Sequence, residues 1–230
     1  MRRIFILENL DSVSQENRDY FNMLNARGEN MFYKVLDRSG KTHKYAYKDI
    51  SFLGFDENLC PHCGRTIATM HYHGGGHKLV LEGGKEYPDL LGFHGAGKQM
   101  LIFSGKALSL FKQYNISGIS DSEQIQVLEK RGSELIDLTG IAPDYWAVHI
   151  VGTVELDFSS MRLKKKNKCE NCGQFTWNRQ RLTPLALDEN TWNGHDLCRV
   201  TSIPGYVVCT SAVKRLVEEY ALSGFDFALL

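Results

Sequence analysis

Apolar and polar positions along the chain predict two early strands and, later, a strand followed by a helix. Met31 to Leu36 and Tyr45 to Phe55 are rich in apolar and aromatic residues, a composition typical of strands. Met100 to Ile119 predicts a buried strand, a helix and a tight turn after the helix. Within it, an apolar stripe from Ala107 to Tyr114 has helical spacing, and Ser104 before it is a typical helix N-cap.

This pattern occurs a second time near the end of the chain. Tyr206 to Phe225 aligns with Met100 to Ile119 without a gap at an offset of 106 residues. Only four of the twenty aligned positions are identical, but the apolar pattern matches almost throughout, and Thr210 replaces Ser104 as the expected cap. Short dipeptides repeat as well: Asp89-Leu90 and Asp196-Leu197 before the helices, and Ser117-Gly118 and Ser223-Gly224 after them.

Two C-x-x-C-G turns, Cys60/Cys63 and Cys169/Cys172, are also repeated, at an offset of 109 residues. Three kinds of landmark at nearly one offset indicate an internal duplication. We therefore expect an α+β fold with two pseudo-repeat halves, about 1–125 and 126–230. Each half would be a short mixed sheet with a helix, and both would share one core in a single zinc-stabilised domain.

The two turns also predict the chemistry of the site. A C-x-x-C turn can place two thiolates on one metal ion, and two such turns complete a closed tetrahedral zinc site. Such a site has no open position for a substrate, so we expect Cys60, Cys63, Cys169 and Cys172 to hold one structural zinc ion. Duplication accounts for the long gap between the pairs. The other two cysteines, Cys198 and Cys209, are expected to be ordinary core residues.

Composition narrows the classes of function. The 27 basic and 27 acidic residues balance, which argues against a dedicated nucleic-acid or membrane binder. The charge run from Lys164 to Lys168 is typical of a solvated loop, and a zinc-containing nucleic-acid module that uses it remains an alternative. No secretory or membrane-spanning segment is evident, so we expect a cytoplasmic protein with reduced thiols.

Two enzymatic interpretations stay open. His71, His73 and His77 could bind a catalytic metal, with Asp89 or His94 as a further ligand, although no recognisable general base accompanies them. Cys60-Pro61-His62-Cys63 also matches the redox motif of thiol oxidoreductases. The sequence after it is poor in helix formers, and a redox function leaves the second cysteine pair unexplained.

The two turns CPHCG and CENCG, with the Tyr-Pro-Asp-Leu-Leu segment at 87–91, resemble the double-CXXCG motif family of bacteria. The resemblance covers roughly residues 55–228 and carries over only the four cysteines as site residues. It implies an immunity protein that binds and neutralises a cognate polymorphic toxin without catalysis. By composition, the candidate toxin contacts are two groups: His71, Tyr72 and His73, and Trp177, Arg179 and Arg181.

Overall fold

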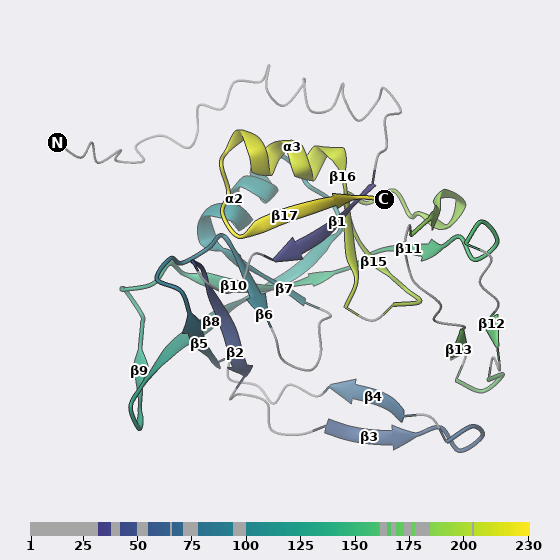
Figure 1. The fold of residues 1–230 in the computed structure, drawn as a ribbon, viewed down its shortest axis with the longest axis horizontal. Helices are drawn as coiled ribbons and strands as arrows, with labels where there is room; N and C mark the ends of the chain where they lie inside the picture. Colours follow the sequence, from purple (N-terminus) through teal and green to yellow (C-terminus); the bar gives the residue numbers. More distant parts are fainter. Residues whose placement is uncertain are drawn as a thin grey trace.

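Strands dominate the part of the chain that the computed structural model describes, namely residues 32–37, 42–49, 55–64, 66–70, 78–93, 100–161, 165–166, 169–172, 176–177, 185–203 and 205–230. The two α-helices in these ranges, α2 (Gly105–Gln113) and α3 (Ser211–Glu219), have nine residues each. The expected α+β fold therefore overstates the share of helix, because mixed sheets make up most of the structure (Figure 1). One reason is the long strand after α2, in which Ile125 and Val127 are buried and the adjacent Gln124 and Gln126 are not.

The first sheet closes into a six-stranded barrel. Its hydrogen-bonded order is β10-β7-β6-β2-β5-β8, and β10 also pairs with β8, while β9 extends from β8 as a seventh strand. The strands are β2 (Lys44–Asp49), β5 (Lys78–Gly83), β6 (Leu90–Phe93), β7 (Met100–Ser104), β8 (Ile119–Arg131), β9 (Glu134–Asp137) and β10 (Tyr145–Ile150).

The second sheet has six strands in the order β14-β11-β15-β16-β1-β17 and forms a half-barrel. The 3₁₀-helix η2 (Glu189–Thr191) follows β14 directly. The strands are β1 (Phe32–Asp37), β11 (Gly152–Leu156), β14 (Leu187–Asp188), β15 (Leu197–Val200), β16 (Val207–Thr210) and β17 (Phe225–Leu229). The strand expected at Met31 to Leu36 is thus confirmed as β1.

The strand pairings of the two sheets correspond, and each sheet takes one strand from the other half of the sequence. The pair β2–β6 is parallel, as is β11–β15, and both β6–β7 and β15–β16 are antiparallel. Strand β1 precedes the first sheet in sequence but pairs with β16 and β17 of the second. Strand β10 pairs with β7 and β8 of the first sheet. Figure 1 shows this exchange as the purple β1 beside the yellow β17.

The two strand–helix units have the geometry expected from the repeat. Helices α2 and α3 start 106 residues apart, and both are followed by a non-glycine residue with positive φ, Asn115 at 54° and Ala221 at 46°. Ser104 caps α2 through the Ala107 N–H. Thr210 occupies the N-cap position of α3, and its hydroxyl donates to Asp196 as that of Ser104 does to Asp89, but it caps no amide. One buried cluster contains apolar residues of both helices and both sheets, including Phe103, Phe111, Val213, Leu216 and Phe225.

Each repeated aspartate contacts the Ser-Gly turn of the other unit. The Asp196 carboxylate accepts hydrogen bonds from the Ser117 N–H at 3.0 Å, the Ser117 hydroxyl at 2.7 Å and the Thr210 hydroxyl at 2.9 Å. The Asp89 carboxylate accepts the equivalent three, from the Ser223 N–H and hydroxyl and from the Ser104 hydroxyl. These reciprocal contacts join the two units across their shared core, a role that the repeated dipeptides alone did not reveal.

The glycine of each Ser-Gly turn is required by a close approach. Gly118 has φ of +96°, and a Cβ there would lie 2.1 Å from the carbonyl oxygen of Leu197. Substitution of Gly118 by alanine is therefore expected to lower the free energy of unfolding by about 3 kcal/mol or more, measured by urea denaturation. Gly132→Ala is the control, since Gly132 has φ of +63° with no atom within 4 Å of the added Cβ. A loss of about 1 kcal/mol is expected there from backbone strain alone, and equal losses in both variants would contradict the clash.

Two small β-hairpins stand apart from the sheets (Figure 1). Strands β3 (Phe55–Leu59) and β4 (Thr66–Met70) form the first, and β12 (Lys165–Lys166) and β13 (Thr176–Trp177) form the second. The prediction that the lysine run lies in a loop is wrong for Lys165 and Lys166, because these two residues pair with Trp177 and Thr176 in the second hairpin. In both hairpins the connecting segment contains a C-x-x-C turn.

Candidate metal centre

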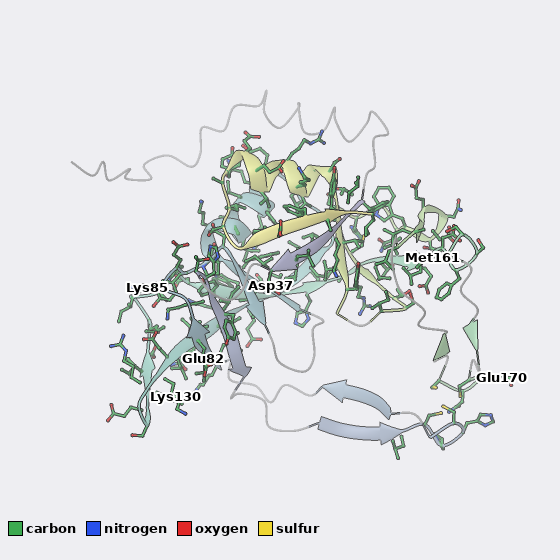
Figure 2. All side chains as sticks on the ribbon, in the orientation of Figure 1. Asp37, Glu82, Lys85, Lys130, Met161 and Glu170 are labelled. Atoms are coloured by element: carbon green, nitrogen blue, oxygen red, sulfur yellow. The ribbon has the colours of Figure 1, made fainter. Side chains whose placement is uncertain are left out.

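The two hairpin turns bring the four predicted cysteines together. Cys60 and Cys63 follow β3, and Cys169 and Cys172 follow β12. The sulfur atoms of Cys60 and Cys169 are 3.8 Å apart, and those of Cys63 and Cys172 are 3.7 Å apart. All four sulfur atoms lie within 4.8 Å of one another. Figure 2 shows them as a yellow group beside Glu170, where the ends of the two hairpins meet.

These separations fit a metal ion held by four sulfurs. A disulfide would need a sulfur–sulfur distance of about 2.05 Å, and none of the six cysteines forms one. In a regular tetrahedron with metal–sulfur bonds of about 2.3 Å, the sulfurs are about 3.8 Å apart. The two short distances match that edge length, so these four cysteines can hold one metal ion. Within the described residues, no other group of three or more such side chains lies close enough to do so.

Local backbone geometry shapes the first turn. The Gly64 N–H donates to the carbonyl oxygen of Cys60 at 2.8 Å, and Gly64 adopts φ of +66°. This left-handed conformation is accessible to glycine at little cost, which explains the glycine that follows the second cysteine. The first cysteine of each turn is buried, Cys60 at 1% and Cys169 at 4% exposure, while the second is half-buried. The first cysteine of each turn is therefore the one shielded from solvent, and the second lies on the outer side of the centre.

Hydrogen bonds to the sulfurs favour thiolates. The side-chain amide of Asn171, 3.5 Å from the Cys60 sulfur, and then the backbone N–H of Cys63 lower the pKa of Cys60 to about 6. The backbone N–H of Cys172 is the main cause that lowers the pKa of Cys169. Thiolates are the form that binds metal. Sequence reasoning missed Asn171, although its place between the cysteines of the second turn was a usable signal.

The other two cysteines differ from this set. Cys198 and Cys209 are fully buried in the second sheet, which confirms their predicted place in the core. Burial raises the pKa of Cys198 to about 12 and raises that of Cys209 as well. Both therefore remain thiols at neutral pH, and the Cys198 thiol donates to the carbonyl oxygen of His195.

The histidines of the proposed catalytic cluster lie outside the described residues. His71, His73, His77 and His94 lie outside them, as do the candidate contacts Tyr72, Arg179 and Arg181. For Trp177 the structure describes only the backbone, which lies in β13. Asp89, a further candidate ligand for that cluster, instead accepts hydrogen bonds from Ser104 and Ser223.

A polar groove of about 420 Å³ lies on the first sheet beside a buried ion pair. The Lys44 ammonium donates to the Glu129 carboxylate at 2.6 Å, with side-chain exposures of 10% and 20%, and Arg131 contacts the same carboxylate at 2.9 Å. The hydrogen bond from Lys44, and then that from Arg131, lowers the pKa of Glu129. Both charges of the pair are thus satisfied within the fold.

Substitution of Glu129 by glutamine is expected to lower the free energy of unfolding by about 1–3 kcal/mol at pH 7, because Lys44 loses its partner. A depressed carboxyl pKa stabilises the fold above the unfolded pKa, and this contribution disappears as pH falls through the folded pKa. The difference in stability between wild type and variant should therefore begin to shrink as pH falls below about 4.5. Urea denaturation across pH 3–7 tests this, and a difference that stays constant down to the acid end would contradict it.

Neither described helix is long and apolar enough to cross a membrane. No protein-family model matches the chain, and no curated protein is significantly similar to it. The candidate metal centre is therefore assigned from the arrangement of its own four sulfur atoms.

Proposed function

We propose that the four cysteines hold zinc and that this zinc is structural. Four thiolates saturate a tetrahedral ion and leave no position for substrate or water, as is typical of structural zinc. The sulfur separations of 3.7 and 3.8 Å support tetrahedral coordination. When bound, the ion would supply a cross-link between the first and second hairpins, more than 100 residues apart in sequence.

We infer that the chain arose by internal duplication. The equivalent strand pairings, the helices 106 residues apart and the reciprocal aspartate contacts support this. The phenol oxygens of Tyr114 and Tyr220, equivalent in the repeat, also form a hydrogen bond with each other. A four-cysteine centre built from one turn of each half fits the same origin.

We propose that the protein is an immunity protein, which binds a cognate bacterial toxin and blocks it without catalysis. The observation that carries this proposal is the joining of both C-x-x-C-G turns in one centre, since those turns carry the resemblance to the double-CXXCG family. A cytoplasmic location would follow, because reduced thiols are needed for the metal centre.

The test is co-expression with the product of the adjacent open reading frame. The neighbour alone should arrest growth, and this chain should restore growth and co-purify with it at 1:1 stoichiometry. A matched strain that expresses Gly118→Ala, expected to be destabilised, should protect less well. A neighbour that is harmless on its own, or that does not bind, would refute the immunity function.

A thiol oxidoreductase using Cys60 and Cys63 is the second candidate, and the lowered pKa of Cys60 favours it. Metal binding requires the same Cys60 thiolate. The two functions therefore differ in whether the thiolates hold a metal ion or react with a disulfide. Insulin reduction with dithiothreitol separates them. Catalysis by wild type that Cys63→Ser abolishes would support the redox function, while no rate above the uncatalysed reaction would leave zinc binding as the role of the pair.

A further inference from the structure

The second sheet lacks a closing contact that the first sheet makes. In the first sheet, β5 and β8 pair in parallel, with Lys78 opposite Gln126, and this pair helps to close the barrel. Their counterparts are β14, which pairs with β11 as β5 does with β2, and β17, which follows α3 as β8 follows α2. These two strands lie at opposite ends of the second sheet and do not pair with each other. Within the described part of the chain, the half-barrel is therefore open between them.

The free edge of β17 presents main-chain groups away from β1. The Leu230 N–H donates to the carbonyl oxygen of Phe32 at 3.1 Å, and Leu229 lies opposite Tyr33. In an antiparallel ladder the bonded pairs alternate, so residues 225, 227 and 229 direct their N–H and C=O groups outward. The Phe227 N–H is accepted by the Asp226 carboxylate at 3.1 Å. For Phe225 and Leu229, no main-chain partner on this edge occurs among the residues described.

Partly buried apolar side chains are more numerous around the half-barrel than around the closed barrel. The buried cluster of the closed barrel has two such neighbours, Tyr87 and Ala142. The buried cluster of the half-barrel has seven, namely Phe158, Met161, Leu187, Trp192, Ile203, Tyr206 and Leu230. On the neighbouring edge, Leu229 is 63% exposed. An apolar side chain of a partner could therefore pack against these partly buried residues.

The charge at the far side of the opening is negative. Glu155 on β11 lies directly opposite Asp188 on β14, and Glu189 follows at once. The hydroxyl of Ser159 is the main cause that lowers the pKa of Asp157 to about 2, so this fourth carboxylate is charged at neutral pH. The stretches 152–161 and 185–196 contain no lysine or arginine. Like charges placed opposite each other destabilise a strand pair, and a basic partner would relieve that repulsion.

We propose that the open side of the half-barrel, the β17 edge together with the β14 rim, binds an extended strand of the partner protein. This strand would pair with the outward groups of β17, direct an apolar side chain toward the partly buried residues around the cluster and place flanking lysines or arginines near Glu155, Asp188 and Glu189. The partner's identity as a toxin rests on the proposed function. The binding mode rests on the unpaired edge, the partly buried apolar side chains and the charge.

The test compares two variants of one exposed residue against the purified product of the adjacent open reading frame. Leu229→Pro removes an outward N–H and places a ring on the edge, while the bonds from β17 to β1 remain. Leu229→Ala removes the side chain only. We expect the proline variant to raise Kd by about tenfold or more and the alanine variant by less than about threefold, with melting temperatures close to wild type. Glu189→Lys should weaken binding most at low salt.

The other outcomes overturn the inference in distinct ways. Equal affinities for the proline and alanine variants would exclude strand pairing at this edge. A melting temperature that falls in the proline variant, without partner, would show that another part of this chain already occupies the edge. Loss of a dimer in that variant would assign the edge to a second copy. If wild type does not bind the neighbour at all, the immunity function fails and this inference fails with it.

Discussion

Replacement of Cys169 by serine is expected to release the bound metal and to lower the free energy of unfolding by about 3 kcal/mol or more. Serine cannot supply the thiolate, and three remaining sulfurs hold zinc far more weakly. The binding free energy of a structural metal contributes to folding, and here it would join two hairpins that each contain only a short strand pair. Metal content of the purified variant and urea denaturation would measure the two effects.

Cys198→Ala is the matched control for that experiment. Cys198 is another buried cysteine of the C-terminal half, but its thiol donates to His195 and lies outside the four-sulfur group. Its substitution should leave the metal content at that of wild type, with a loss of about 1–2 kcal/mol from the small cavity. Full metal content in Cys169→Ser, or equal metal loss in both variants, would contradict the assigned ligand set.

Substitution of Asp196 by alanine is expected to lower the free energy of unfolding by about 3–5 kcal/mol. The carboxylate accepts three hydrogen bonds that join its own unit to the Ser-Gly turn of the other, and hydrogen bonds to charged groups contribute about 1.5–3 kcal/mol each. The hydroxyl of Thr210, a residue only 3% exposed, would also lose its acceptor. Asp89→Ala should behave in the same way, because its contacts are equivalent.

Asp137 offers a matched control with the same donors. Its carboxylate accepts from the N–H and hydroxyl of Thr139, at 2.8 and 2.7 Å, and from the Gln126 side chain at 2.6 Å, but all three contacts are exposed. Asp137→Ala should cost about 1 kcal/mol or less, since water replaces the lost partner. If urea denaturation gave Asp196→Ala a similarly small loss, the reciprocal contacts would not be what holds the two units together.

Local patterns in the sequence predicted the elements that depend on local chemistry. The strand–helix units of 100–119 and 206–225 were identified because their apolar stripes and tight exits are local features. The four cysteines were grouped correctly because the spacing of each turn limits what it can bind, and the repeat links one turn to the other. Both predictions needed only nearby residues and a shared offset.

The exchange of strands between sheets could not be predicted in this way. The apolar pattern of residues 32–37 indicates a strand but carries no information about its partner, and β1 pairs with residues about 180 positions away. Likewise Asp89 was noted as a landmark and as a candidate metal ligand, while its contact with Ser223 lies 134 residues away in sequence. Thr210 was expected to cap a helix, but its hydroxyl accepts from no helix amide and only donates to Asp196. Contacts between residues far apart in sequence decided the first two cases.

Zinc K-edge X-ray absorption on the purified wild-type protein, together with its metal content, tests whether the four cysteines hold a structural zinc ion. We expect one zinc ion per chain in a shell of four sulfurs at about 2.3 Å, with no nitrogen or oxygen ligand. Protein that is stable without metal, a shell that contains histidine nitrogen, or disulfides among Cys60, Cys63, Cys169 and Cys172 would contradict it.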